Sequence, residues 1–276
     1  MSKNIKVAVR VRPLLPAEIK AGHSSTKLKI NKIKNEIGVK TEDNMIRTYH
    51  FDNVFDMDSN QDEVFKSLNI STFISKLIEG FHCTIFAYGQ TGSGKTYTME
   101  HYEYALTDKS SRPKPIFNNS MDGIVHKGII ELFKQIEEYK AKKDSDFKIF
   151  ASFLQIYNEK IYDLLNMKNA TDITAPLRLR WSKEDQFTVD GLYMGECNNM
   201  DNLLMLYNNG IKNRYTATHK MNIASSRSHT IFSIFINNSK KKLTSNGTYS
   251  KLQFVDLAGS ERSLITDPTN KRFKER

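Results

Sequence analysis

The sequence has few of the residues that hold small disulfide-bonded or zinc-binding domains together. Only two cysteines, Cys83 and Cys197, occur in 276 residues, too few for a disulfide framework or a zinc cage. The seven histidines are scattered without the spacing of metal ligands. This usage indicates a protein of a reducing compartment, and the chain is long enough to bury an ordinary apolar core.

Long apolar runs are also lacking. No stretch approaches the roughly 18 apolar residues that a transmembrane helix needs, and Met1 to Asn4 carry no apolar core of a signal peptide. We therefore expect a chain that neither spans a membrane nor has one as its partner.

Acidic residues are outnumbered by basic ones. Lys and Arg total 41, Asp and Glu total 31, and the net charge is +10. This balance favours an acidic partner, such as nucleic acid, an anionic membrane or an acidic protein surface, although it can also serve solubility alone. No basic stripe interleaved with aromatic residues and no nucleic-acid motif accompanies the charge, so we expect no nucleic acid partner.

One stretch, Gly89 to Thr96, fits the phosphate-loop pattern G-x-x-x-x-G-K-[ST]. Its glycines allow the tight turn that aims backbone N–H groups at phosphate oxygens. Lys95 would contact the β- and γ-phosphates, and the Thr96 hydroxyl would bind Mg²⁺. An apolar run over 83–88 precedes the loop and a helix can open at Lys95, which is the context that a phosphate loop requires. The alternative is a plain Gly/Ser surface turn.

Apolar periodicity predicts strands and helices along the rest of the chain. Strands are predicted over 5–13, 26–30, 36–40, 46–51, 83–88, 147–157, 230–237 and 252–256, with a strand pair within 177–195. Helices are predicted over 60–80, 95–99, 129–139, 158–165 and 203–211. Asn60, with Glu63 three residues later, is a candidate N-cap. Residues 101–122 are polar and predict a long surface loop.

This alternation predicts an α/β fold, a P-loop NTPase with a central, mostly parallel twisted sheet flanked by helices on both faces. In such sheets the ligand lies at the carboxyl ends of the strands. Asp256 ends an apolar strand, where it would hold Mg²⁺ through water, and the N–H of Gly259 would sense a γ-phosphate. A polar loop from Asn222 to His229 would complete the metal shell and position the attacking water.

Five stretches of the sequence resemble the kinesin motor domain. They are IKVAVRVRP at 5–13, FAYGQTGSGKTYTM at 86–99, LQIYNEKIYDLL at 154–165, NIASSRSHTIFSI at 222–234 and VDLAGSER at 255–262. They occur in the order found in that family and span nearly the whole chain, so the chain is identified as a member of it.

The resemblance implies ATP and Mg²⁺ as cofactors and a role for each motif residue. It implies that the ATP phosphates are bound by Gly89, Gln90, Thr91, Gly92, Ser93, Gly94, Lys95 and Thr96. It implies an adenine framed by Arg10, Pro13 and Tyr97. It implies Mg²⁺ held directly by Thr96 and through water by Asp256, with Ser226 joining the metal shell in the closed state. It implies that the γ-phosphate and the lytic water are contacted by Asn222, Ser225 and Gly259.

The resemblance also implies a contact between two switch loops, formed by Arg227 and Glu261, with Glu261 relaying the proton of the water. The alternative is an ordinary surface ion pair worth at most about 1 kcal/mol. The implied partner is the microtubule, whose acidic tubulin suits the basic net charge. A cytoplasmic, cytoskeletal location is implied too, and a dimer is allowed through a stalk that is absent from this sequence.

The resemblance breaks at the C-terminus. The family's motor domain continues into a relay helix, a central strand and a neck linker, so residues 1–276 are expected to be one motor domain that is incomplete there. A missing central strand would leave N–H and C=O groups of its neighbours unpaired. Residues 265–270 depart from the usual loop, and the 101–122 loop is longer than in other members.

Two other functions remain open. The first is a nucleotide-binding kinesin-like module or fragment without turnover, which the intact switch residues argue against and the truncation argues for. The second is an unrelated phosphate-loop kinase or GTPase, although no acceptor pocket and no guanine-selecting Asn-Lys-x-Asp can be identified. Movement along microtubules and their depolymerisation are not distinguished.

Overall fold

The computed structural model describes residues 5–100, 103–105, 114–116, 123–143, 145–166, 175–182, 186–220, 227–240 and 248–261. The chain divides into two compact units, Met1–Ile70 and Ser71–Arg276. No helix within these ranges is long and apolar enough to cross a lipid bilayer.

The first unit contains a three-stranded meander, a parallel strand pair and two short helices. Its strands are β1 (Ala8–Arg10), β2 (Leu28–Asn31), β3 (Glu36–Lys40), β4 (Ile46–His50) and β5 (Asn53–Phe55), and its helices are α1 (Pro16–Lys20) and α2 (Gln61–Ser67). The antiparallel meander β2-β3-β4 confirms the three strands predicted there. β1 pairs with β5 and covers only the centre of its predicted range. Just before it, the Val7 N–H donates to the Asp52 carboxylate.

Asn60 caps α2 as predicted, since its Oδ1 accepts a hydrogen bond of 2.8 Å from the Glu63 N–H. The single helix predicted over 60–80 is wrong, because the chain forms two helices there. Asn69 has φ of 56°, a left-handed conformation that ends one helix before α3 (Ile70–Ile78) begins.

The second unit is built on a six-stranded sheet of order β10-β9-β14-β15-β6, with β13 also paired to β9. The strands of this sheet are β6 (Cys83–Ala87), β9 (Ser145–Tyr157), β10 (Lys160–Asp163), β13 (Gly195–Glu196), β14 (His229–Lys240) and β15 (Thr248–Asp256). Two further hairpins are β7 (Glu103–Ala105) with β8 (Lys114–Ile116) and β11 (Arg178–Ser182) with β12 (Gln186–Asp190). Besides α3, the helices are α4 (Lys95–Met99), α5 (Ile124–Lys142) and α6 (Met200–Lys220).

The sheet is mixed, and the prediction of a mostly parallel sheet is wrong for it. β15 and β6 pair in parallel, whereas β9 pairs antiparallel with β10, β13 and β14, and β14 with β15. A two-residue turn closes β9 and β10, with Asn158 at φ 48° and Glu159 at φ 59°. Such a turn builds a hairpin, whereas a parallel pair needs a long crossover. The same turn overturns the helix predicted over 158–165, where β10 lies instead.

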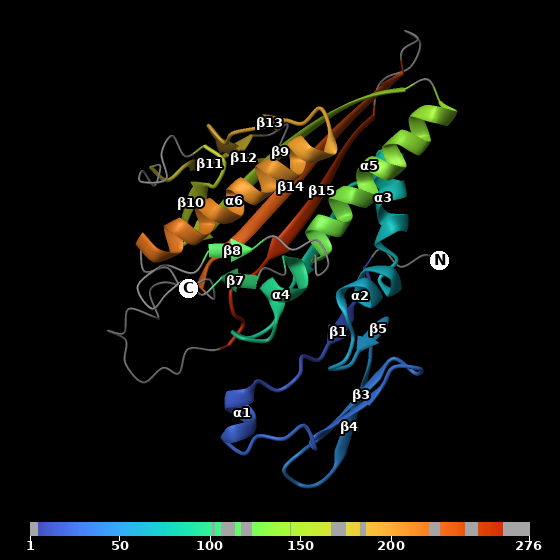
Figure 1. Ribbon diagram of the computed structural model, residues 1–276, viewed down its shortest axis with the longest axis vertical. Coiled ribbons are helices and arrows are strands. Elements are labelled where there is room, and N and C mark those ends of the chain that lie inside the picture. The colour runs from blue at the N-terminus through green and yellow to red at the C-terminus, as the bar shows by residue number, and fades with distance from the viewer. Residues whose placement is uncertain are drawn as a thin grey trace. The chain divides into compact units, whose positions relative to one another are not determined.

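One face of this sheet forms the core. Phe153 of β9, Phe232 of β14 and Phe254 of β15 stand opposite one another in register and are at most 2% exposed. From α6, Tyr207 stacks on Phe153 with 5.8 Å between ring centroids. From α5, Gly128 lies against Phe254. Figure 1 shows both helices running in roughly the same direction as the long strands. Burying each aromatic ring stabilises the unit by roughly 1.5–3 kcal/mol.

The opposite face carries an apolar row across four strands. Leu154, Ile231, Val255 and Phe86 are partners in successive strand pairs. Leu154 is buried, but Phe86 is 61% exposed. Contacts place α4, α5 and α6 on the core face. These three helices therefore cover one face of the sheet, whereas helices were predicted on both.

Candidate nucleotide site

The phosphate loop joins β6 to α4, as predicted. Gly89, Gly92 and Gly94 have φ of 153°, 76° and 96°, conformations that glycine adopts without strain. A Cβ atom on Gly89 would lie 2.7 Å from the Ser93 Oγ, so a larger residue does not fit there. α4 begins at Lys95 directly after the loop. The strand, loop and helix therefore follow one another in the order that a phosphate loop requires.

Lys95 lies over this loop. Its Nζ donates to the carbonyl oxygens of Gly89 at 2.9 Å and Gln90 at 3.0 Å. A side chain that can reach these carbonyls holds its positive charge where a phosphate would be cradled.

Thr96 and Asp256 meet at the carboxyl end of β15, although they are 160 residues apart in the sequence. The Thr96 Oγ1 donates to the Asp256 Oδ2 at 2.7 Å, and Asp256 is only 4% exposed. The other carboxylate oxygen, Oδ1, is buried and has no hydrogen-bond partner among the described residues. Buried carboxylate oxygens are normally paired, so this atom indicates a place for a further ligand.

Two charged residues that the sequence did not point to complete this end of the sheet. Arg214 of α6 donates from Nη2 to the Asp256 Oδ2 at 3.1 Å and from Nη1 to the Glu100 Oε1 at 2.5 Å. Burial raises the pKa of Glu100, the Arg214 charge opposes this, and the Asp256 charge adds to it, giving a pKa of about 7. The sequence offers little indication of this pair, because Arg214 and Glu100 are only charged residues near the ends of two predicted helices.

The loop after β15 contacts the phosphate loop. The Thr91 N–H donates to the Glu261 Oε2 at 2.9 Å, and the Thr91 hydroxyl donates to Oε1 at 2.5 Å. The Ser260 N–H donates to the Gly89 carbonyl at 3.1 Å. A Cβ atom on Gly259 would collide with the Glu261 carboxylate and the Thr91 hydroxyl, so a larger residue there would have to displace this contact.

His229, at the start of β14, holds the same loop. Its Nδ1 accepts a hydrogen bond of 3.1 Å from the Ala258 N–H, which requires a ring nitrogen without a proton. Burial lowers the pKa of His229, and the Asp256 charge opposes this only in part. The sequence placed His229 in a polar loop but gave no role to its ring.

The described residues do not test the roles of the remaining predicted site residues. Asn222, Ser225 and Ser226 lie outside the described residues. Arg10 and Pro13 belong to the first unit, where the Arg10 guanidinium donates to the Gln61 Oε1 at 2.8 Å and the Ser59 carbonyl at 2.9 Å. Tyr97 is 50% exposed on α4. Their adenine and metal roles stay predictions, as does the Arg227–Glu261 contact.

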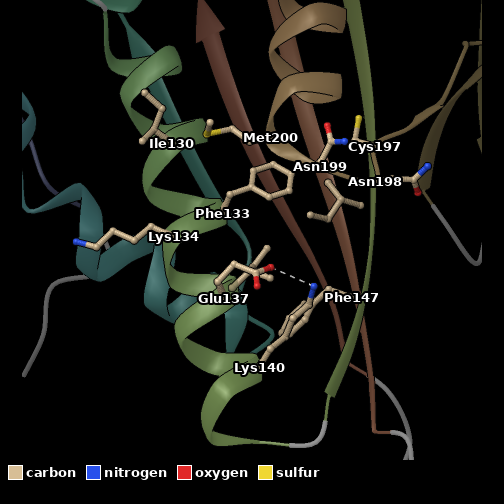
Figure 2. Close-up of a pocket in the computed structure, with 12 residues that line it drawn as sticks. Ile130, Phe133, Lys134, Glu137, Lys140, Phe147, Cys197, Asn198, Asn199 and Met200 are labelled. Carbon is tan, nitrogen blue, oxygen red and sulfur yellow. Dashed lines mark hydrogen bonds and ion pairs between the residues drawn. The ribbon is translucent and has the colours of Figure 1, made fainter.

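A separate cavity of about 420 Å³ lies between α5, β9 and the start of α6. Figure 2 shows Phe133 extending from α5 into it, with Phe147 and Met200 also on its wall. Glu137 and Lys140 form an ion pair of 3.3 Å beside it. Its walls contain none of the phosphate-loop residues, so it is not part of the nucleotide site.

Comparison with known proteins agrees with this geometry. The family model of the kinesin motor domain matches residues 10–276. This chain belongs to the kinesin motor-domain family. A solved structure of a fast kinesin superposes with a TM-score of 0.81 at 27% identity, covering 98% of this chain and 70% of that one. Kinesin motor domains as a class are microtubule-associated ATPases that bind ATP with Mg²⁺.

Longer kinesins share this stretch. The mouse kinesin-like protein KIF27 is 36% identical over 280 residues, and the Xenopus laevis chromosome-associated kinesin KIF4 is 35% identical over 273. Mouse kinesin-like protein KIF11 is 32% identical over 286 residues. Each alignment covers at least 98% of this chain but between 18% and 26% of the relative. The chain thus spans a quarter or less of the length of most of these kinesins.

Proposed function

We propose that this chain is the ATP-hydrolysing part of a microtubule motor. The observation that carries the proposal is the meeting of Lys95, Thr96, Asp256 and Glu261 at the carboxyl ends of β6 and β15. A phosphate loop, a metal-holding carboxylate and a carboxylate for the attacking water are the parts that phosphoryl transfer needs.

The donor atoms present suit Mg²⁺, which prefers hydroxyl, carboxylate and water oxygens. Thr96 and Ser226 are proposed to bind it directly, and Asp256 through water, using the Oδ1 that has no hydrogen-bond partner within the described part of the chain. When bound, the ion neutralises charge on the phosphates.

The chain's own residues are proposed to position the reactants. The Lys95 ammonium exchanges the loop carbonyls for the β- and γ-phosphates, and the Gly259 N–H donates to the γ-phosphate. Glu261 releases its contact with Thr91 and pairs with Arg227 as the two switch loops close. It then accepts the proton of the attacking water. The lytic water is held by Asn222 and Ser225, and the adenine by Arg10, Pro13 and Tyr97. Backbone N–H groups over 89–96 cradle the phosphates.

The proposed partner is the microtubule, and the proposed setting is the cytoplasm. We take residues 1–276 as a portion of one motor domain. A dimer would form through chain outside this sequence.

ATP turnover with and without microtubules tests the proposal. Lys95→Ala is expected to lower turnover at least about 100-fold because it removes charge from the transition state. Glu261→Ala is expected to lower it by roughly 10²–10⁴-fold because the water loses its base. Lys76→Ala and Glu79→Ala are the controls, since these residues form an exposed ion pair of 2.7 Å at the C-terminal end of α3.

Unchanged turnover in both site variants would contradict the proposal. Tight nucleotide binding without turnover in the parent chain would instead favour a nucleotide-binding module.

A further inference from the structure

Three charged side chains tie α4, α6 and β15 together. Arg214 lies between Glu100 at the end of α4 and Asp256 at the end of β15, at 2.5 Å and 3.1 Å. The three side chains are only 5–6% exposed. Taking charges out of water costs several kcal/mol per ion unless each is well paired, so a buried group of this kind needs a specific explanation.

The two carboxyl oxygens of Asp256 are bonded differently. Oδ2 accepts from both Arg214 and Thr96, whereas Oδ1 has no hydrogen-bond partner among the described residues. The network therefore holds Asp256 by one oxygen and leaves the other oxygen available to a further ligand.

The Arg214 guanidinium is suited to fixing the position of the Asp256 Oδ1. It is planar and presents its N–H groups in a rigid fork, so contacts from Nη1 and Nη2 set the direction of both carboxylates. A lysine ammonium in the same place would be a point charge without such a fork.

We propose that Arg214 is a positioning residue that aims the Asp256 Oδ1 toward the Mg²⁺ site, and that Glu100 holds Arg214 in place. This inference rests on the proposed function, in which the Asp256 Oδ1 holds Mg²⁺ through water. Residues that orient a metal-holding carboxylate typically change metal affinity 10- to 100-fold when they are replaced.

The test is the release of a fluorescent ADP from the full chain as free Mg²⁺ is varied. In Arg214→Gln, the Mg²⁺ concentration that gives half-maximal retention is expected to rise at least about tenfold. Release in excess chelator is expected to match the parent, because the phosphate loop itself is unchanged. A purely structural role would lower the melting temperature without moving the Mg²⁺ midpoint.

Arg214→Lys separates geometry from charge. The proposal predicts a midpoint close to that of Arg214→Gln, and a parental midpoint for the lysine variant would overturn it. Asn213→Ala is the matched control on the same helix, because the Asn213 amide donates to the Leu164 carbonyl at 2.7 Å and takes no part in the network. It is expected to lower stability and leave the midpoint unchanged.

Glu100→Gln keeps an oxygen acceptor for Arg214 but removes its counter-charge, so a smaller shift in the same direction is expected. If circular dichroism shows that the Arg214 variants do not fold, this variant alone supports the proposal by a shifted midpoint or overturns it by a parental one. A parent chain that retains ADP equally at all Mg²⁺ concentrations would refute the metal site itself. A Mg²⁺-dependent parent with unshifted variants would refute only the role of Arg214.

Discussion

At the scale of single residues, burial sets the protonation of His229. His229 keeps its Nδ1 free of a proton because that atom accepts the Ala258 N–H, and burial lowers its pKa below the ordinary value. The folded protein therefore binds fewer protons than the unfolded chain at pH values just below about 6.5. The stability that His229 contributes is complete above that pH and is lost as the pH falls toward the lowered pKa.

The melting temperature of the parent is accordingly expected to fall more steeply below about pH 6.5 than that of His229→Gln, which cannot gain a proton. Thermal melts between about pH 8 and pH 5 measure the difference. His50→Gln is the control, because the His50 side chain is 69% exposed. Parallel pH curves for the parent and the His229 variant would show that this contact does not titrate.

At the scale of elements, the distance between α6 and the sheet depends on one glycine. A Cβ atom on Gly210 would collide with the Phe153 ring and lie 3.3 Å from the Leu165 Cδ2. Alanine favours a helix over glycine by up to about 1 kcal/mol, but an overpacked core costs roughly 1–3 kcal/mol. The close approach is therefore expected to outweigh helix propensity.

Gly210→Ala is expected to lower the free energy of unfolding by roughly 1–2 kcal/mol, measured by urea denaturation. Phe153→Leu supplies room at the point of collision, so Gly210→Ala should cost clearly less in that background. An equal cost in both backgrounds would mean that the ring is not the obstacle.

The sequence predicted correctly those elements that depend on interactions between residues close together in the chain. Asn60 and the phosphate loop were found because their residues act on neighbours a few positions away. The break at Asn69 and the turn at Asn158 were missed because a positive φ in asparagine leaves no periodic signal. Strand direction was missed too, since it depends on which distant strands pair.

The site shows the same division. Motif spacing identified Lys95 and Thr96, the end of an apolar strand identified Asp256, and the resemblance added Glu261. Arg214 and Glu100 form a contact across 114 residues, which no sequence window contains. Tertiary pairs of this kind become visible only when the fold brings them together.

For the whole molecule, the net charge of +10 bears on the proposed partner. Affinity for microtubules is expected to fall as salt rises from about 0.01 to about 0.1 M, because the Debye length shortens from about 30 to about 10 Å. Cosedimentation at several salt concentrations measures this. ATP turnover without microtubules is the control, and a constant microtubule affinity would show that charge does not drive the contact.

The separation of the site's partners along the chain also sets the order in which the protein can fold during synthesis. Thr96 meets Asp256 after 160 further residues, and Thr91 meets Glu261 after 170. At about 5–20 residues per second, the ribosome needs roughly 8–30 s to supply Asp256 after Thr96. Throughout that interval the phosphate loop and β6 lack the carboxylates and the β15 partner that the folded chain gives them. The nascent chain therefore acquires its nucleotide site late, whatever the order of its other elements.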